Sequence, residues 1–227
     1  MLKKHPRFYK TMEEIFPGVY EHEKRLYTKN LVPGKSVYGE RLLNYKGVEY
    51  REWDPFRSKL AGAIKKSLNY FPFEKDSKVL YLGASTGTTI SHLSDIVTDG
   101  EIYGVELSKR MIMELVKLAE DRENIIPILA DARMPQEYEE VGKVDILYQD
   151  VAQPDQVDIF LKNTEVFKPE WGFLALKTQS MDISKTPEQL LDISQQQLSK
   201  KYDILQTIDL NPFDKMHYFL VLRRKDI

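Results

Sequence analysis

Short stretches of alternating apolar and polar residues, separated by turns, occupy the start of the chain. Residues 18–21 and 25–28 have the period of two that half-buried strands show. Residues 42–45 and 48–51 stand on either side of a Lys-Gly pair, where the glycine permits the tight turn of a β-hairpin. None of these stretches is long enough for a parallel strand–helix–strand unit. Residues 1–54 are therefore predicted to form a small antiparallel, β-rich N-terminal module.

After this module the period of the apolar positions changes. Leu60, Ile64 and Leu68 recur every fourth residue, which predicts an amphipathic helix over residues 58–70. Strands and helices then alternate, with strands expected at 78–82, 102–106, 125–129, 144–148, 171–178, 204–209 and 218–223, and helices at 88–97, 109–122, 154–167 and 187–198. Such alternation is typical of a mostly parallel sheet covered by helices on both faces. The last two strands lack an intervening helix and should pair as an antiparallel hairpin at the sheet edge. Residues 55–227 thus have the pattern of the α/β, Rossmann-like, seven-stranded methyltransferase fold.

The composition excludes several kinds of chemistry. The 227 residues contain no cysteine, which rules out disulfides, thiolate metal sites and thiol nucleophiles. No two of the four histidines have the spacing of a zinc site, so no metal is expected. No apolar run approaches the roughly 18 residues of a membrane span, and the N-terminus does not resemble a signal peptide. We expect a cytosolic or nuclear protein with no membrane partner.

The net charge of −2 hides an uneven distribution of charged residues. Residues 1–60 hold 13 Lys or Arg against 8 Asp or Glu, whereas the remaining residues hold 20 against 27. A basic N-terminal part on an acidic body would suit an anionic partner. An ordinary fluctuation explains the division equally well, and composition alone does not decide between the two.

A glycine-containing loop follows the first strand of the predicted parallel sheet. Gly83 and Gly87 lie in this loop, and a helix begins directly after it at Thr88 and Thr89. Such a turn lets the backbone approach a ligand closely, with helix N–H groups pointing at it. The two glycines match neither the three-glycine dinucleotide fingerprint nor the Walker loop. The alternative is a strand–helix turn that merely requires glycine.

The ends of the next two strands carry carboxylates. Glu106 closes the second strand, 23 residues after Gly83, where it is placed to accept hydrogen bonds from both ribose hydroxyls of a nucleoside. Asp131 follows the third strand and is placed to accept the amino group of an adenine. A solvent-facing carboxylate that caps the next helix is the alternative for Glu106. Together the three strand ends predict an adenosine-containing ligand, and the glycine pattern favours S-adenosylmethionine over NAD.

Several long sequence strings resemble the fibrillarin family, the RNA 2′-O-methyltransferase subunit of box C/D ribonucleoproteins. They follow the order found in that family and span the predicted methyltransferase domain. The Asp-Val-Ala-Gln-Pro-Asp-Gln string is far more specific than any two-glycine loop. The strings comprise residues 54–61, 79–89, 124–127, 131–133 and 150–156.

The resemblance implies S-adenosylmethionine-dependent methylation of ribose 2′-hydroxyls in rRNA and tRNA, without a metal. Its catalytic positions match Lys59, Asp150, Lys177 and His217. Its cofactor positions match Gly83, Ala84, Thr88, Thr89, Glu106, Leu107, Asp131, Ala132, Asp150, Val151, Ala152 and Gln153. In this scheme Val151 and Gln153 line the methionine end of the cofactor, and Thr88 and Thr89 cap the loop helix near the cofactor carboxylate.

Each proposed catalytic residue also has a structural interpretation. Lys177 ends an otherwise apolar strand, and we interpret it as base or oxyanion partner oriented by Asp150; a lysine whose ammonium reaches solvent is the alternative. Lys59 is expected near the ribose-phosphate, or else on a solvated basic face. His217 is either catalytic or a histidine satisfied at a strand start. The family often has an acidic residue directly before this histidine, whereas here Met216 precedes it and Asp214 lies further back.

The sequence contains no recognisable RNA-binding module, and its isoelectric point near 6.1 argues against tight autonomous RNA binding. The resemblance supplies the missing specificity through a box C/D guide RNA, a Nop-type scaffold protein and a small kink-turn-binding protein. The chain resembles archaeal members in that it has no Gly/Arg-rich N-terminal tail, and this resemblance implies the cytoplasm of an archaeal cell.

Two other functions remain open: a methyltransferase for a protein side chain or small molecule, and a ribonucleoprotein scaffold with a vestigial cofactor site. Aromatic residues of the N-terminal module are core or a scaffold-binding face, namely Phe8, Tyr9, Phe16, Tyr20 and Tyr27.

Overall fold

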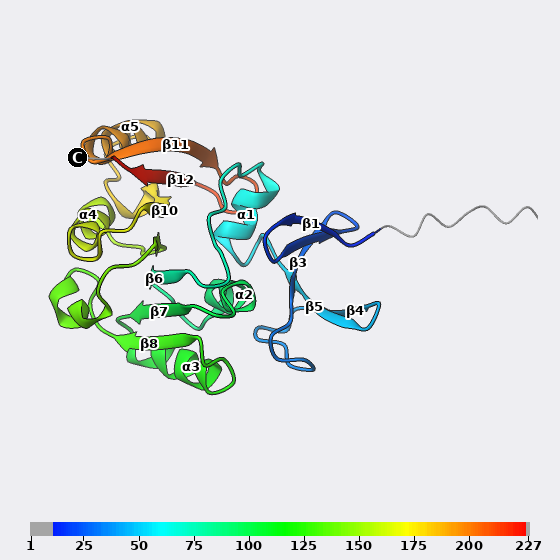
Figure 1. The fold of residues 1–227 in the computed structure, drawn as a ribbon. Coiled ribbons are helices and arrows are strands. Elements are labelled where there is room, and N and C mark those ends of the chain that lie inside the picture. Colours follow the sequence, from blue (N-terminus) through cyan, green and yellow to red (C-terminus); the bar gives the residue numbers. More distant parts are fainter. Residues whose placement is uncertain (1–10, 226–227) are drawn as a thin grey trace, which may run out of the picture.

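The computed structural model describes residues 11–225 and contains two β-sheets (Figure 1). The smaller one is a five-stranded antiparallel sheet with the order β1-β2-β3-β5-β4. The sequence pattern indicated four of its strands but missed β1. Phe8 and Tyr9 lie outside the described residues, whereas Tyr27 is buried in the core. The strands are β1 (Glu13–Phe16), β2 (Val19–His22), β3 (Arg25–Lys29), β4 (Leu42–Tyr45) and β5 (Val48–Trp53).

The larger sheet has seven strands in the order β11-β12-β10-β9-β6-β7-β8. Six of them run in the same direction, and β12 alone runs the opposite way, antiparallel to its neighbours β10 and β11. This arrangement confirms the predicted Rossmann-like methyltransferase fold and its terminal hairpin. The strands are β6 (Lys78–Leu82), β7 (Glu101–Glu106), β8 (Ile125–Leu129), β9 (Ile146–Gln149), β10 (Trp171–Lys177), β11 (Tyr202–Asp209) and β12 (His217–Arg224).

The α-helices follow the predicted order, but the first is much shorter than residues 58–70. It is capped by Ser58, whose Oγ accepts the N–H of Ala61, and it ends before Ser67, which adopts a left-handed conformation (φ 68°). Leu68 is buried all the same, so the apolar period identified the buried face correctly. None of the α-helices in residues 11–225 is long and apolar enough to cross a membrane. They are α1 (Lys59–Lys65), α2 (Thr88–Ile96), α3 (Lys109–Glu120), α4 (Gln156–Phe167) and α5 (Pro187–Leu198), with 3₁₀ helices at Pro135–Val141 and Thr178–Ser180 that the sequence pattern did not indicate.

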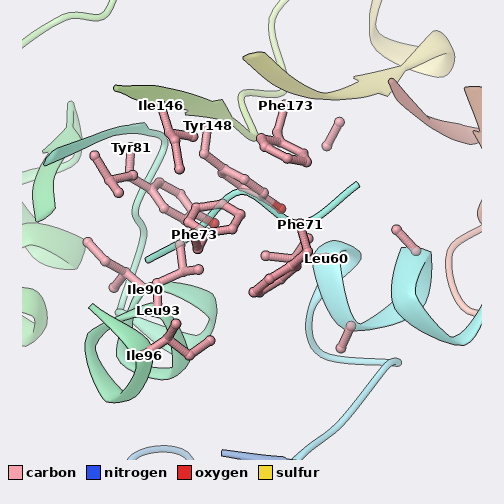
Figure 2. Close-up of a cluster of buried hydrophobic side chains, with 14 of the residues drawn as sticks. Leu60, Phe71, Phe73, Tyr81, Ile90, Leu93, Ile96, Ile146, Tyr148 and Phe173 are labelled. Carbon is pink, nitrogen blue, oxygen red and sulfur yellow. The ribbon is translucent and has the colours of Figure 1, made fainter. Parts of the chain in front are cut away.

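A hydrophobic cluster on one face of the large sheet joins it to α1, α2 and the small sheet. Figure 2 shows side chains from strands β6, β9 and β10 facing those of α1 and α2. Val19, Leu26 and Trp53 of the small sheet belong to the same cluster and are 0–1% exposed. Burying each such apolar side chain contributes about 1.5–3 kcal/mol. The small sheet therefore shares its core with the methyltransferase fold.

A buried polar network fixes α2 to the small sheet. The Asp95 carboxylate of α2 pairs with Arg51 of β5 (3.0 Å) and with Arg122 (2.7 Å), and all three side chains are at most 1% exposed. The same carboxylate accepts the hydroxyl of Thr28 of β3 (2.6 Å) and the backbone N–H of Leu31 (3.0 Å). Because both guanidinium groups and the carboxylate are mutually paired, the cost of burying these charges is offset.

His92 lies beside this network and is also fully buried. Its ring stacks on Trp53 with centroids 4.9 Å apart, and its Nδ1 lies 2.7 Å from the Thr28 hydroxyl. Burial and the neighbouring charges of Arg51 and Arg122 hold the pKa of His92 well below its ordinary value of 6.5. The ring is therefore neutral at neutral pH and adds no positive charge to the network.

Candidate functional site

A crevice opens at the carboxyl edge of the large sheet, outside the ends of β6, β7, β8 and β9. Open α/β sheets bind ligands at this position because the loops after adjacent parallel strands meet there. Nine of the predicted cofactor residues line it. The full lining is Gly83, Ser85, Val105, Glu106, Leu107, Ala130, Asp131, Ala132, Arg133, Asp150, Val151, Ala152, Gln153 and Ile159.

Gly83 lets two of these strand ends approach each other. It has a φ of 82°, and a Cβ at this position would lie 2.3 Å from the carbonyl oxygen of Asp150. Gly87 ends the loop with a φ of 101°, where a Cβ would lie 2.4 Å from the side chain of Leu118. Both positions therefore require glycine, for backbone conformation and for packing.

The Glu106 carboxylate is held at the end of β7 by backbone groups. Its Oε2 accepts the N–H of Ser85 in the glycine loop at 2.9 Å, and its Oε1 accepts the N–H of Ser108 at 2.8 Å. Each oxygen retains a lone pair, since a carboxylate has about four acceptor sites. Glu106 thus combines a fixed position in the crevice with free acceptor capacity for the two hydroxyls of a ribose.

The far wall of the crevice contains an arginine that the sequence interpretation did not assign. Arg133 forms two hydrogen bonds to the Asp155 carboxylate, each 2.9 Å long, and a third to the Gln153 side chain at 2.8 Å. Its backbone N–H donates to Asp131 (2.9 Å). Arg133 therefore joins the loops after β8 and β9. In the sequence, its position in the Asp-Ala-Arg string at residues 131–133 was the feature that could have identified it as a site residue.

Three predicted cofactor residues lie outside the crevice lining. Ala84 is 4% exposed and belongs to the hydrophobic cluster beneath the loop. Thr88 lines a different hollow, and the first turn of α2 has no side-chain cap because Gly87 occupies that position. The buried hydroxyl of Thr89 donates to Ser58 at 3.0 Å instead. The prediction that Thr88 and Thr89 cap the loop helix is therefore wrong, and Thr89 ties α2 to the start of α1.

An ion-pair network lies beside the Asp150 end of the crevice. The ammonium of Lys59, the first residue of α1, lies 2.9 Å from Asp150 and 3.6 Å from Asp214. Burial lowers the pKa of Lys59, but the two carboxylates outweigh burial and leave the pKa above its ordinary value of 10.5. Lys59 is therefore a fixed cation at neutral pH and is no candidate for a proton acceptor.

His217 joins the same network through Asp214. Its Nδ1 lies 2.8 Å from Asp214 Oδ1 and 2.9 Å from the carbonyl oxygen of Lys215. Both partners can only accept, so Nδ1 carries the hydrogen and Nε2 carries the free lone pair of the neutral ring. Burial lowers the pKa of His217 below its ordinary value of 6.5. Asp214, which sequence reasoning left unassigned, supports the imidazole from three residues away.

Lys177 ends β10 directly opposite His217, which begins β12, in the antiparallel pairing of these strands. Its backbone N–H and carbonyl are both bonded to the side chain of buried Gln156, at 2.8 and 3.0 Å. Its ammonium has no carboxylate within 4.0 Å among residues 11–225. Asp150 therefore pairs with Lys59 and not, as predicted, with Lys177. The reason is that the start of α1 brings the Lys59 ammonium to the end of β9, where Asp150 lies.

Comparison with known proteins decides the family. A sequence profile of the fibrillarin family matches residues 7–226. This chain belongs to the fibrillarin family. A fibrillarin-like rRNA/tRNA 2′-O-methyltransferase from Saccharolobus islandicus is 50% identical over 220 residues, which is 94% of this chain and 95% of that protein.

Solved structures of fibrillarins share the fold over nearly the whole chain. Aeropyrum pernix fibrillarin, crystallised with natively bound S-adenosyl-L-methionine, has a TM-score of 0.82 and 42% identity, covering 90% of this chain and 92% of its own. A fibrillarin in complex with Nop5p has a TM-score of 0.87 and 38% identity, covering 94% of this chain and 100% of its own. The fibrillarin fold therefore includes the N-terminal sheet as well as the methyltransferase sheet.

Proposed function

We propose that this chain transfers the methyl group of S-adenosylmethionine to ribose 2′-hydroxyls of rRNA and tRNA. The observation that carries the proposal is the network of Lys59, Asp150, Asp214 and His217 beside the crevice at the carboxyl edge of the large sheet. The activity of the 50% identical relative supports the reaction, and the ligand of the Aeropyrum pernix protein supports the cofactor.

The crevice has the chemistry that S-adenosylmethionine requires. Glu106 offers both carboxylate oxygens to the ribose, and Asp131 stands one strand further along for the adenine amino group. Val151 and Gln153 continue the lining toward Asp150, where the methionine part would lie. When bound, the cofactor supplies an activated methyl group whose leaving group is a neutral thioether.

The protein residues would supply position, charge and a proton acceptor. Asp150 holds Lys59 at the sheet edge, so that its ammonium stabilises the oxyanion that develops on the 2′-oxygen. His217 has its proton at Nδ1 and offers Nε2 as a proton acceptor. Lys177, opposite His217 and without a carboxylate partner among residues 11–225, is the second candidate for the base or for the oxyanion partner.

The lowered pKa of His217 predicts the pH profile of methyl transfer. A histidine base acts only in its neutral form, so the rate falls as pH drops through the His217 pKa, below 6.5. We expect single-turnover rates on the plateau at pH 7 and a decline of slope one at more acidic pH. In a His217→Gln variant this acidic limb should disappear along with most of the rate. An unchanged acidic limb in that variant would exclude His217 as the base.

We propose that the chain acts within a box C/D particle containing a guide RNA, a Nop-type scaffold protein and a small kink-turn-binding protein. The fibrillarin/Nop5p complex supports the scaffold partner. An isoelectric point near 6.1 leaves little charge for autonomous RNA binding, which supports delegation of target choice to a guide RNA. We place the particle in the cytoplasm of an archaeal cell, as the archaeal source of the relative suggests.

Reconstitution tests this function. The chain, a guide RNA and both partner proteins should methylate one defined 2′-hydroxyl, and Lys177→Ala should slow that step by about 10²-fold or more. The variant should bind S-adenosylmethionine with unchanged affinity in calorimetry, because Lys177 does not line the crevice. Methylation of protein but not of guided RNA would contradict the proposal, as would full-rate methylation of a defined ribose by the chain alone.

A further inference from the structure

The segment that leads into α1 carries the most exposed aromatic ring among the described residues. Phe56 is 66% exposed, only three positions before Lys59. Its ring meets Phe213 edge to face, with centroids 5.1 Å apart. Phe213 packs on α1 at Gly62 and directly precedes Asp214, which pairs with Lys59 and His217. The exposed ring is therefore fixed to both segments that build the ion-pair network.

Arg57, the next residue, is exposed on the other side of this segment. Its guanidinium lies over the ring of Tyr38, 5.4 Å from the centroid, and together with Arg41 it lines a polar hollow. No carboxylate lies within 4.0 Å of either guanidinium among residues 11–225, although Glu40, Glu52 and Asp54 line the same hollow. Two of these carboxylates are engaged elsewhere, Glu40 with Arg51 and Glu52 with Arg25.

We infer that Phe56 and Arg57 form an RNA-contacting rim of the site, where the ring packs on a sugar next to the methylated ribose and the guanidinium binds a backbone phosphate. This inference rests on the proposed function. Lys59 belongs to the network and is the first residue of α1, so a 2′-hydroxyl that reaches the network comes close to the segment that carries Phe56 and Arg57. A-form RNA presents 2′-hydroxyls in its wide, shallow minor groove and is recognised there mainly through sugars and phosphates. A flat apolar ring beside a free cation has the chemistry of such a surface, and it recognises shape independently of sequence.

The chain offers a matched control for the ring. Tyr70 is also an exposed aromatic, at 39%, and it contacts Trp171 at the start of β10, the opposite edge of the sheet from the crevice. In reconstituted particles, Phe56→Ala should raise the KM for substrate RNA about tenfold, the loss expected for one well-buried aromatic contact. Phe56→Leu, which keeps most of the apolar area, should have a smaller effect, and Tyr70→Ala should have none. The affinity for S-adenosylmethionine should be unchanged in all three variants, which reports that they are folded.

The charge of Arg57 has a separate readout. Arg57→Gln should weaken binding of different substrate sequences by a similar factor and should reduce the salt slope of binding by about one. Lys143→Gln removes one exposed charge just before β9, at the opposite edge of the sheet, and should leave the slope unchanged.

Different results separate the rim from the function on which it rests. If the wild-type particle is active, equal KM values for Phe56→Ala and Tyr70→Ala would overturn the inference that Phe56 contacts RNA and would leave the proposed function intact. Loss of scaffold-protein capture by a Phe56→Asp variant without RNA present would also overturn it, since the ring would then bind protein. A wild-type particle that binds S-adenosylmethionine but methylates no guided RNA would overturn the proposed function, and the rim with it.

Discussion

Exchange of Lys59 for methionine is expected to slow methyl transfer by about 10²–10³-fold, the usual cost of removing one group that stabilises a developing oxyanion. The ammonium lies between Asp150 and Asp214, so its loss would leave two carboxylates facing the reacting oxygen. Like charge at this place would oppose the oxyanion as well as leaving it without a cation. Single-turnover methylation in the reconstituted particle measures the effect.

Lys65 provides the control on the same helix. It is also ion-paired, with Glu21 at 2.9 Å, but this pair lies between α1 and the small sheet. Lys65→Met should therefore retain nearly the full rate. Equal losses in the two variants would mean that Lys59 acts only by holding α1 in place.

Replacement of Asp95 by asparagine should lower the free energy of unfolding by about 3–5 kcal/mol, the cost of breaking a buried charge pair from one side. The variant would leave Arg122 and Arg51 close together in the interior, and within residues 11–225 Glu40 would be the one carboxylate still paired with either of them. A domain is stable by about 5–15 kcal/mol, so this change removes a large share. Denaturant unfolding at neutral pH, followed by circular dichroism, gives the difference.

A surface ion pair supplies the comparison for Asp95. Asp121 pairs with Lys35 at 2.6 Å, but both side chains are more than 40% exposed. Exposed pairs contribute about 0–1 kcal/mol, so Asp121→Asn should hardly change the midpoint of unfolding. If Asp95→Asn were equally mild, water would have to reach the two guanidinium groups in the native state.

Periodicity predicted the large sheet because its strands and helices differ in period and follow one another in order. It failed where tertiary contacts override local preference. The helix predicted over residues 58–70 ends early because the chain turns at Ser67 into a left-handed conformation, which no apolar pattern encodes. The buried polar network was also not predictable from local sequence, because Asp95 contacts Thr28 and Arg51, which are 67 and 44 positions away in the sequence.

The site divides in the same way. Gly83 and Glu106 were predictable because loops after adjacent parallel strands must meet at one edge. Asp214 was not, because its contact with His217 depends on the turn before β12, where Met216 has a φ of 58°. The pairing of Lys59 with Asp150 instead of Lys177 likewise depends on where α1 begins, which strand order does not determine.

The polar network around Asp95 restricts which N-terminal sheets this chain can acquire by recombination with its relatives. Thr28 and Arg51 of the small sheet contact Asp95 of α2, the helix that follows the glycine loop. The two sheets therefore share one buried polar network. A chain that began at residue 54 would keep the pair of Asp95 and Arg122 but would lose Arg51 and Thr28 as partners of Asp95, and with them support for the loop that lines the crevice. The sequence pattern predicts the N-terminal sheet as a separate module. An exchange of this sheet between relatives can nevertheless succeed only if the incoming sheet carries Thr28 and Arg51 to meet Asp95 of α2.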